Sequence, residues 1–376
     1  MRFNLLLISI VLLLTAACAR QIETKIKAES PDTQNYTHEV IVTDLVSPWS
    51  IAFLPQGGML ITEKSGELIL FKDDTKTNIQ GVPDVHLNGQ GGLMDIELHP
   101  NYAENGWIYI SYSSRKGEGK GSNTAIIRAK LANDTLIEIE ELYKGTPNTT
   151  RGVHYGSRIT FDNQGYLFFS IGDRGSRDTN PQDITLDGGK IYRIHDDGRI
   201  PDDNPFIDQE NGKKAIYSYG HRNPQGMTKH PETGEIWSHE HGPKGGDEIN
   251  IIHKGKNYGW PVITYGINYS GTTITDKTNQ VGMEQPLFYW VPSIAPSGMA
   301  FLDSDIYPDW QGSLLVGSLK FACIERITLI DNQVTAREKI LENLGRVRSI
   351  KIGPEGYIYA GVEGLGVVMV LPKTTE

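Results

Sequence analysis

The sequence predicts an all-β protein, a six-bladed β-propeller with four-stranded antiparallel blades. Six segments share one pattern: a glycine, any residue, Leu or Ile, and then a large apolar residue. The glycines of this pattern are Gly58, Gly106, Gly165, Gly234, Gly312 and Gly356. Their average separation is about 60 residues, a period that suits four-stranded propeller blades. Six copies therefore predict six blades.

The composition also favours many short strands joined by turns. Gly (41) and Pro (19) make up about 16% of the 376 residues, against roughly 12% in average proteins. Long segments with helical periodicity are hard to find. The alternative fold is a β-sandwich whose turns merely look alike.

Each repeat reads as strand, turn, strand and further strands. Short apolar runs precede several of the glycine segments, at residues 49–53, 157–161 and 347–352. The glycine spacing varies from 44 to 78 residues, which predicts long insertions in the middle units. Residues 36–45 form one further strand pattern. We expect this strand to complete the last blade and so close the ring.

The N-terminus has the pattern of an export signal. Residues 5–14 are an unbroken apolar run behind Arg2, too short for a bilayer span of about 20 residues. Small residues follow, and the segment that ends in Cys18 also resembles a bacterial lipoprotein signal. Plain cleavage and lipidation of Cys18 therefore both remain open. We expect an exported protein, periplasmic or in the cell envelope, with membrane contact only through a lipid anchor at Cys18.

The domain boundaries follow from this pattern. Residues 1–17 are the predicted signal, residues 18–36 a polar tether, and residues 37–372 a single propeller domain.

Charge and cysteine content exclude several classes of protein. With 38% hydrophobic and 22% charged residues, the chain is neither wholly disordered nor a polytopic membrane protein. The formal net charge of −10 argues against a nucleic-acid partner. Only Cys18 and Cys323 are present, so a disulfide scaffold and a cysteine-rich zinc site are excluded. Cys323 lies in an apolar segment, which predicts a buried, inert thiol.

Polar residues cluster directly after the repeated strands. Asp173 follows the third repeat, the segment 238–250 (SHEHGPKGGDEIN) follows the fourth, and Lys320 follows the fifth. In equivalent blades these segments lie at equivalent ends of the ring. They can therefore converge on one site, although they are far apart in the sequence.

The segment 239–250 suggests a cation site. His239 and His241 alternate along a strand and could bind a transition metal. The glycine-rich loop after them could instead present backbone carbonyls and carboxylates to a hard cation such as Ca²⁺. No third histidine with zinc spacing accompanies the pair, which favours calcium. A polar loop without a metal remains the alternative.

Two arginines suggest an anion site. Arg346 and Arg348 are two residues apart, so on a strand they point the same way. Such like charges repel each other unless an anion lies between them, and guanidinium groups suit carboxylates and phosphates. Lys320 and Arg222 are further candidates, each of which could also be an ordinary surface cation. Several cations in one cleft of an acidic protein indicate a polyanionic small molecule.

His154, just before the third repeat, is a candidate proton acceptor. A neutral imidazole can take a proton near pH 7. Asp173, in the same predicted blade, could orient this ring. A purely structural histidine is the alternative.

Nine segments of the chain together resemble one protein family. They are GQGGLMDIELHP (89–100), VHYGSRITF (153–161), IGDRG (171–175), GHRNPQGM (220–227), HEHGPKGGDEIN (239–250), NYGWP (257–261), VPSIAPSG (291–298), GSLK (317–320) and GRVRSIKIGPEG (345–356). Through these nine segments the chain resembles the soluble aldose sugar dehydrogenases that depend on pyrroloquinoline quinone (PQQ). These enzymes belong to the glucose/sorbosone dehydrogenase family. The similarity runs from about Val40 to Leu371.

The resemblance implies a six-bladed propeller with PQQ in a polar cleft on one face. The three carboxylates of this cofactor would account for a group of cations in an acidic protein. The positions that match quinone-binding residues of the family are Gln90, Arg222, Asn223, Ser293, Lys320, Arg346 and Arg348. His154 matches the catalytic base, and Asp173 and Asp247 match polar residues that support it.

The resemblance also implies calcium and a reaction. Gly242 and Pro243 match a loop whose carbonyls hold a catalytic Ca²⁺ against the quinone, and Glu248 and Tyr258 match a second, structural calcium site. The implied reaction is oxidation of the anomeric hydroxyl of an aldose to a lactone, with PQQ as hydride acceptor. An external acceptor of quinone or cytochrome type would then take the electrons.

Two other functions share some of these residues. A calcium-dependent propeller hydrolase acting on lactones or esters would use the Ca²⁺ and the histidine. It would give no reason for Lys320, Arg346 and Arg348 to converge. An extracellular binding propeller would need neither the histidine nor a redox cofactor.

Overall fold

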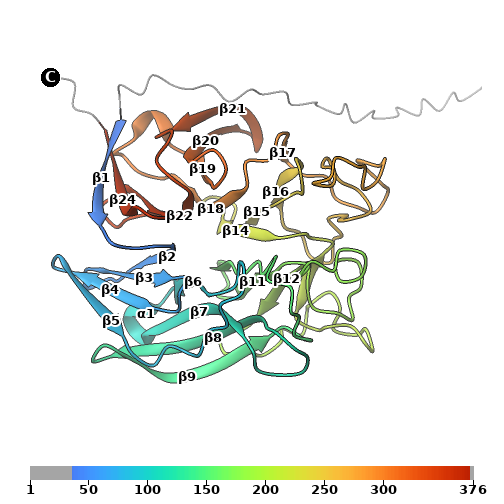
Figure 1. Cartoon of the computed structure of the whole chain (residues 1–376), viewed down its shortest axis with the longest axis horizontal. Helices are drawn as coiled ribbons and strands as arrows, with labels where there is room; N and C mark the ends of the chain where they lie inside the picture. The colour runs from blue at the N-terminus through green and yellow to red at the C-terminus, as the bar shows by residue number, and fades with distance from the viewer. Residues whose placement is uncertain (1–35, 373–376) are drawn as a thin grey trace, which may run out of the picture.

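The computed structural model describes residues 36–372 and confirms the all-β, six-bladed propeller. Six four-stranded antiparallel sheets surround a common centre (Figure 1). Two short helical segments occur in these residues, α1 (Tyr102–Asn105) and the 3₁₀ turn η1 (Pro308–Trp310). Neither is long or apolar enough to cross a membrane. The predicted signal, Cys18 and the tether before Tyr36 lie outside the described residues.

Blades 1 to 3 follow one another along the first half of the chain. Blade 1 contains β2 (Pro48–Phe53), β3 (Met59–Glu63), β4 (Leu68–Lys72) and β5 (Thr75–Ile79). Blade 2 contains β6 (Leu93–Leu98), β7 (Trp107–Ser114), β8 (Asn123–Ala132) and β9 (Thr135–Lys144). Blade 3 contains β10 (Ile159–Phe161), β11 (Leu167–Ile171), β12 (Lys190–Ile194) and β13 (Ile216–Tyr219).

Blades 4 to 6 complete the ring. Blade 4 contains β14 (Pro224–Lys229), β15 (Ile236–Glu240), β16 (Asp247–Ile251) and β17 (Phe288–Trp290). Blade 5 contains β18 (Pro296–Phe301), β19 (Leu314–Ser318), β20 (Cys323–Ile330) and β21 (Gln333–Ile340). Blade 6 contains β22 (Val347–Ile352), β23 (Ile358–Val362), β24 (Gly366–Pro372) and the N-terminal strand β1 (Tyr36–Val42).

The glycine repeat marks the turn before the second strand of every blade. All six glycines have φ between 70° and 89°, where a side chain would strain the backbone. The apolar residues after them enter the second strand, where Leu60, Ile108 and Leu167 are fully buried. The repeat seen in the sequence is therefore a left-handed turn followed by a buried strand.

The first strands of the blades pack side by side around the centre. β2 contacts both β6 and β22, and β10, β14 and β18 complete the circle. Because strands within a blade are antiparallel, the start of each first strand lies beside the end of the second. Pro224, for example, pairs with Glu240. We call the face formed by these two strand ends in all six blades the upper face.

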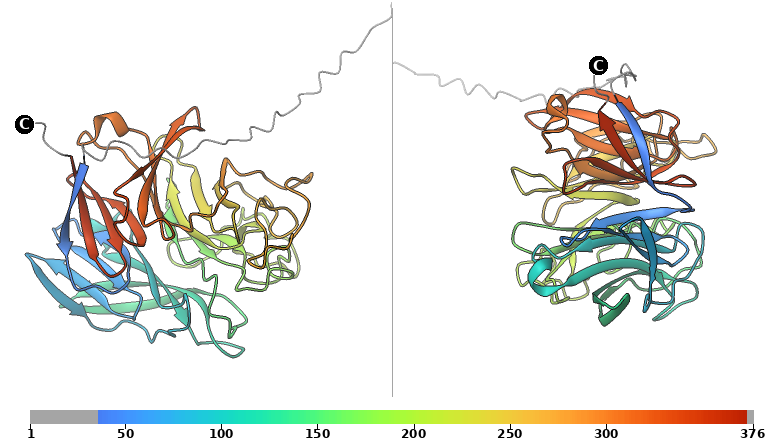
Figure 2. Two further views of the ribbon diagram at one scale, coloured as in Figure 1. Left: turned by 45° about the horizontal axis from the view of Figure 1, so that its top comes forward. Right: turned by 90° about the vertical axis from the view of Figure 1, so that its left-hand side faces the viewer.

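The N-terminal strand closes the ring as predicted. β1 pairs antiparallel with β24, so the first strand of the described chain is the outer strand of the last blade (Figure 2). Val42 is buried at the end of this pairing. Tyr36, which the sequence assigned to the tether, is the first residue of β1. Its ring packs against Trp310 at a centroid distance of 4.0 Å.

Two long connections account for the uneven repeat spacing. One lies between β12 and β13 and the other, residues 252–287, between β16 and β17. They confirm the predicted insertions in the middle units. Cys323 is fully buried, and burial raises the pKa of its thiol to about 12. Both observations agree with an inert thiol.

Shortening Val42 to Ala is expected to lower the free energy of unfolding by about 2 kcal/mol, because the substitution removes buried methyl groups at the closure of the ring. Glu39→Ala on the exposed side of β1 is the matched control and should change it by less than about 0.5 kcal/mol. Denaturant unfolding measures both. Equal effects of the two substitutions would contradict this role of β1.

Candidate active site

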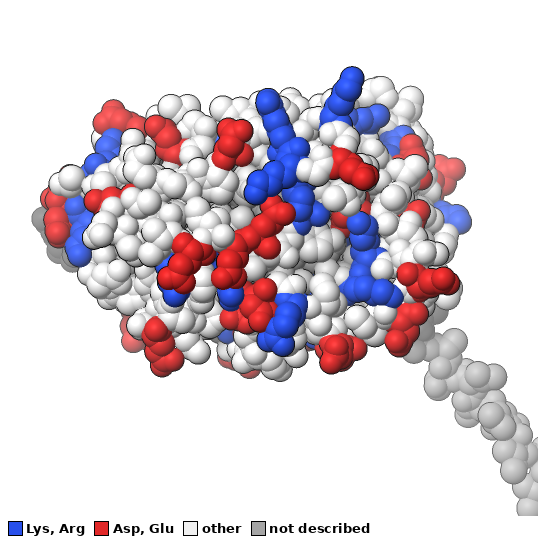
Figure 3. Space-filling view, turned by 90° about the horizontal axis from the view of Figure 1, so that it is seen from below, with Lys and Arg blue, Asp and Glu red and all other residues white. Residues whose placement is uncertain are grey.

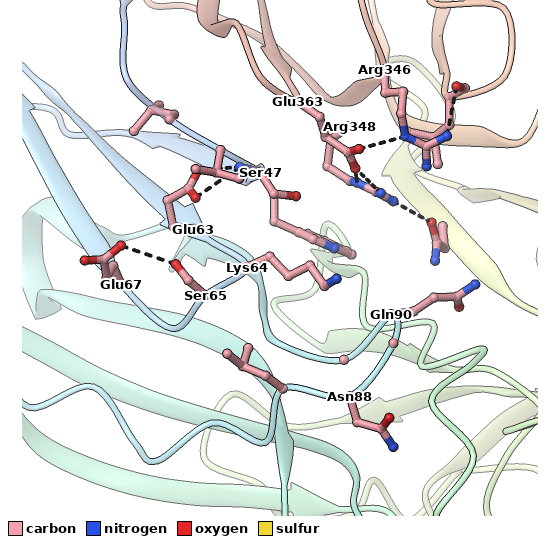
Figure 4. A pocket seen from close by; sticks show the side chains of 18 of the residues that line it. Ser47, Glu63, Lys64, Ser65, Glu67, Asn88, Gln90, Arg346, Arg348 and Glu363 are labelled. Atoms are coloured by element: carbon pink, nitrogen blue, oxygen red, sulfur yellow. Dashed lines mark hydrogen bonds and ion pairs between the residues drawn. The ribbon is translucent and has the colours of Figure 1, made fainter.

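A cavity of about 900 Å³ opens on the upper face, between blades 6, 1 and 2 (Figure 4). Three of the predicted quinone-binding residues line it: Gln90, Arg346 and Arg348. His241, from the segment predicted to converge on this face, also lines it. Among the lining residues that the sequence analysis did not single out are Trp49, Lys64, Gln225 and Glu363.

His154 and Asp173 form a hydrogen-bonded pair in blade 3. His154 precedes β10, Asp173 follows β11, and their Nδ1 and Oδ1 atoms are 2.6 Å apart. Burial lowers the pKa of His154, and this effect outweighs the hydrogen bond with Asp173. Burial would raise the pKa of Asp173, but the hydrogen bond and the charge of His154 lower it. The pair is therefore a neutral imidazole oriented by a carboxylate at neutral pH.

Asp173 is itself held in place by two further donors. The backbone N–H of Gly175 donates to Oδ1 at 2.7 Å, and the indole N–H of Trp260 donates to Oδ2 at 2.9 Å. Since both carboxylate oxygens are engaged, the side chain has one orientation. It accepts the Nδ1 proton of His154, which leaves Nε2 of the imidazole as the proton acceptor.

The backbone around His154 is constrained in a left-handed conformation, with φ of 54°. Such a residue costs of order 1–3 kcal/mol unless its surroundings enforce it. Here Gln90 accepts the backbone N–H of His154 at 2.7 Å. The buried guanidinium of Arg174 donates to the carbonyls of Arg151 and Val153, which precede His154 in the chain. These contacts hold the imidazole where Asp173 can reach it.

Arg222 and Asn223 connect this pair to blade 4. Nη1 of Arg222 donates to the carbonyls of His241 and Gly242, each at 2.9 Å. Oδ1 of Asn223 accepts the backbone N–H of Gly156 at 3.1 Å. Nδ2 of Asn223 is buried and has no partner among the described residues. An unpaired buried donor is costly, and an acceptor oxygen of a ligand would satisfy it.

Arg346 and Arg348 do lie together, but a carboxylate of the protein lies between them. Glu363 accepts from Nε of Arg346 at 2.7 Å and from Nε of Arg348 at 3.0 Å. Arg348 also donates to Gln225, at 3.3 Å. The inference that these like charges require a bound anion is therefore wrong in its physical reason, because Glu363 already separates them. Their position in the cavity agrees with the prediction.

Lys320 and Ser293 lie on the neighbouring loops of blade 5. The backbone N–H of Lys320 donates to Ile294 at 3.2 Å, and Nη1 of Arg346 donates to the adjacent Leu319 at 3.1 Å. The exposed ammonium of Lys320 has no ion pair within residues 36–372 and lies 5.1 Å from the ring centroid of Phe321. It is free to meet an anion.

Asp247 joins these loops to the glycine-rich segment rather than to His154. It accepts from the Ser293 hydroxyl at 2.6 Å and from the backbone N–H groups of Gly242, Ile294 and Ala295. Burial raises the pKa of Asp247 to about 6, although these donors oppose the change. Asp247 therefore fixes the loops that carry Ser293 and Gly242, and its supporting role in catalysis stays a prediction.

The two histidines of the glycine-rich segment bind carbonyls of the next blade. Nε2 of His239 lies 3.3 Å from the Gly298 carbonyl, and Nε2 of His241 lies 2.6 Å from that of Pro296. Carbonyls only accept, so both Nε2 atoms carry protons and have no lone pair for a transition metal. Within residues 36–372, no three His, Cys, Asp or Glu side chains are grouped so as to hold a metal ion.

Three of the predicted calcium ligands, Gly242, Glu248 and Tyr258, line one very small void together with Glu240. The Gly242 carbonyl, next to Pro243, already accepts from Arg222. Burial and the charge of Glu240 raise the pKa of Glu248 far above its ordinary value. The Tyr258 hydroxyl donates to the Ile251 carbonyl at 2.6 Å and accepts from the backbone N–H of His253 at 2.8 Å, so it is engaged on both counts.

The predicted site residues thus lie on loops and strand ends, and hydrogen bonds link many of them to one another or to the cavity. The model of the Glucose / Sorbosone dehydrogenase family matches residues 45–368. The chain belongs to this family. The match spans all six blades and includes every predicted site residue.

Relatives and solved structures agree with this assignment. The chain is 44% identical to the aldose sugar dehydrogenase YliI of Escherichia coli over 338 residues, which is 88% of this chain and 90% of that protein. It is 31% identical to quinoprotein glucose dehydrogenase B of Acinetobacter calcoaceticus over 413 residues, covering 87% and 85% of the two chains.

Two solved structures show the same architecture. The apo form of the soluble aldose sugar dehydrogenase from E. coli superposes with a TM-score of 0.85 at 41% identity, over 90% of this chain and all of that one. The PQQ-bound aldose sugar dehydrogenase from Streptomyces coelicolor superposes with a TM-score of 0.73 at 26% identity, over 93% and 100%.

Within this family site, sequence reasoning missed Lys64 and Glu363. Lys64 directly follows β3, and Glu363 directly follows β23. His241, Asp173 and Lys320 occupy the matching places, one or two residues after the second strands of their blades. Reading the residues after every repeat, instead of the third to fifth, would have found both.

The positive charges of the cavity come from a few neighbouring side chains. On the face shown in Figure 3, basic and acidic side chains are interspersed and form no continuous patch of one sign. In the cavity, Lys64, Arg346 and Arg348 stand together with only part of their charge balanced by Glu363.

Replacing Asp173 by Asn is expected to lower the pKa of His154 further, because the amide removes the negative charge that favours the imidazolium form. An NMR titration of the His154 ring measures this pKa without any substrate. Asp178→Asn, at an exposed position of the same loop, is the control and should leave the titration unchanged. An unaltered curve in Asp173→Asn would mean that the pair does not exist in solution.

Proposed function

We propose that this protein is a PQQ-dependent aldose dehydrogenase, which oxidises the anomeric hydroxyl of aldose sugars to lactones. The observation that carries this proposal is the oriented His154–Asp173 pair on the same face as a cavity lined by arginines. The similarity to a quinoprotein glucose dehydrogenase and to a PQQ-bound structure supports it.

The residues present fit a tricarboxylic quinone. Lys320 has no ion pair among the described residues, and Arg346 keeps half of its side chain exposed (52%). Both can bind carboxylates. The buried, unpaired Nδ2 of Asn223 can donate to a quinone or carboxylate oxygen. Gln90, Arg222, Ser293 and Arg348 complete the proposed binding set. When bound, PQQ supplies the two-electron acceptor that takes the hydride from the anomeric carbon.

His154 and Asp173 would handle the proton of the reaction. Nε2 of His154 accepts the proton of the anomeric hydroxyl, because Nδ1 is committed to Asp173. The lowered pKa keeps the imidazole neutral and ready to act as a base. Asp173, held by Trp260, then stabilises the imidazolium that forms. Gln90 fixes the backbone of His154 and so the position of the ring.

Calcium is the second proposed cofactor. The raised pKa of Glu248, with Glu240 beside it, fits a cation at that small void, since a divalent ion would relieve the repulsion between two buried carboxylates. At Gly242 and Pro243 a cation would share the Gly242 carbonyl with Arg222. A calcium ion bound there would supply a Lewis acid next to the quinone.

We also propose that the enzyme works outside the cytoplasm. The export signal predicted for residues 1–17 supports this location, and Cys18 supplies the site for a lipid anchor. An external acceptor of quinone or cytochrome type would take the electrons from the cofactor.

Reconstitution of the cofactor-free protein with PQQ and Ca²⁺ tests the function. Addition of aldoses should then bleach an artificial electron acceptor, and omission of PQQ should abolish the bleaching. Hydrolysis of lactones or esters without quinone would point to the hydrolase instead. Sugar binding without any redox turnover would point to a binding protein.

His154→Ala is expected to lower turnover by about 10²- to 10⁴-fold while bound PQQ is retained, because the base is lost and the cofactor contacts remain. Steady-state kinetics and quinone absorbance measure the two quantities. The exposed His38→Ala is the control. Full activity in His154→Ala would remove this residue from the mechanism.

The activity of the wild-type enzyme should depend on pH through His154. Protonation removes the base, so kcat/KM should fall as pH falls. Since the pKa of His154 lies below its ordinary value of 6.5, this fall should occur below pH 6.5. The pH profile of kcat/KM measures it. An acid limb centred above pH 6.5 would contradict the assignment.

Arg348→Ala is expected to weaken PQQ binding, because it removes a buried cation and leaves Glu363 less balanced. Arg326→Ala is the matched control, since it breaks a similar ion pair with Glu338 in blade 5. A titration with PQQ compares the affinities. An equal affinity of Arg348→Ala and wild type would contradict the anion-binding role.

A further inference from the structure

Lys64 differs from the other cations of the cavity. Arg346 and Arg348 share Glu363, but the Lys64 ammonium makes no hydrogen bond or ion pair with residues 36–372 (Figure 4). Its side chain extends into the pocket toward the side where Arg348 and Gln90 lie. The loop that carries Lys64 directly follows β3 in blade 1, a blade for which the sequence predicted no ligand.

The position of Lys64 is set by its backbone. Its N–H donates to the Ser47 carbonyl at 3.1 Å, and its carbonyl accepts from the N–H of Leu93 at 3.1 Å. The stem of Lys64 packs over Gly92, where an added Cβ would come within 2.6 Å of Lys64 Cγ. Blades 1 and 2 therefore fix the base of this side chain and aim it into the cavity.

The carboxylates of the cavity have other partners. Glu363 binds the two arginines, and both oxygens of Glu63 accept from the backbone N–H of Ser47 at 3.0 Å. Glu67 accepts from Ser65, and Asp44 lies 3.7 Å from Lys76. None of these carboxylates forms an ion pair with Lys64.

The environment of Lys64 disfavours its charge in the absence of a ligand. Burial lowers the pKa of Lys64, and the nearby charge of Arg348 lowers it further, although Glu363 opposes this effect. An ammonium that is half-buried beside two guanidinium groups gains most from an added anion. A ligand carboxylate would supply the missing counter-charge.

We propose that Lys64 is a further carboxylate-binding residue of this site, whose ammonium binds a carboxylate of the tricarboxylic quinone from blade 1. The inference rests on the proposed function. Arg346 and Arg348 share the carboxylate of Glu363, whereas Lys64 forms no ion pair with it. Lys64 would therefore add a third cation to the site. Blade 1 then contributes a cation to the binding set proposed above.

The test is a titration of the cofactor-free, full-length protein with PQQ, followed by tryptophan fluorescence or equilibrium dialysis. Lys64→Met keeps the straight stem and removes the charge. It is expected to raise the Kd for PQQ by about tenfold or more, as for the loss of a charge-assisted hydrogen bond. Lys64→Arg should restore much of the affinity. The dependence of Kd on salt should be weaker in Lys64→Met than in wild type.

Lys72→Met is the matched control. It lies on β4 of the same blade, at the end away from the upper face, and is exposed. Its affinity for PQQ should equal that of wild type. Thermal unfolding without PQQ should show no lower Tm for Lys64→Met, because the ammonium has no partner to lose. Weaker binding together with a lowered Tm would overturn the proposal, since the effect would then be structural.

The outcomes separate this inference from the proposed function. If wild type binds PQQ and Lys64→Met binds it equally well, the role of Lys64 is wrong and the proposed function stands. If wild type does not bind PQQ at all, both are wrong. Weakened binding in Lys64→Met with recovery in Lys64→Arg supports both.

Discussion

The pairing of β1 with β24 is the constraint on which the rest of the structure depends. It joins the two ends of the described chain within blade 6 and keeps blade 6 beside blade 1. The cavity lies at this junction, with Lys64 on one side and Arg346 and Arg348 on the other. Without closure of the ring, these cations would belong to separate edges of an open array.

Buried charge in this site is arranged in pairs that leave selected groups free. Glu363 holds the two arginines, and Asp173 holds His154. The ammonium groups of Lys64 and Lys320 and Nδ2 of Asn223 are among the groups that have no hydrogen bond or ion pair within the described residues. All three face the same side of the ring, and each suits an oxygen-rich anion. This pattern favours a preformed site that needs little rearrangement on binding.

The sequence predicted much of this site because the repeats are regular. A residue one or two positions after the second strand of a blade falls on the upper face whatever the blade, so Asp173, His241 and Lys320 could be grouped before the structure was known. The sequence did not predict the hydrogen bonds and ion pairs of these residues where the partner is distant in the sequence. Nothing near Arg346 in the sequence shows that Glu363 neutralises it. The carbonyls that occupy His239 and His241 likewise belong to another blade.

The sequence by itself determined the strands, the left-handed glycine turns and the number of blades. Turns and alternating burial involve residues that are close along the chain, so their patterns can be found without the structure. Only the tertiary structure decided which charges are balanced and which are free, because the ion pair Arg158–Asp95 joins two blades and Arg348–Glu363 joins two segments of blade 6 that are 15 residues apart in the sequence. The free cations in the cavity are what remain after those long-range pairs have formed.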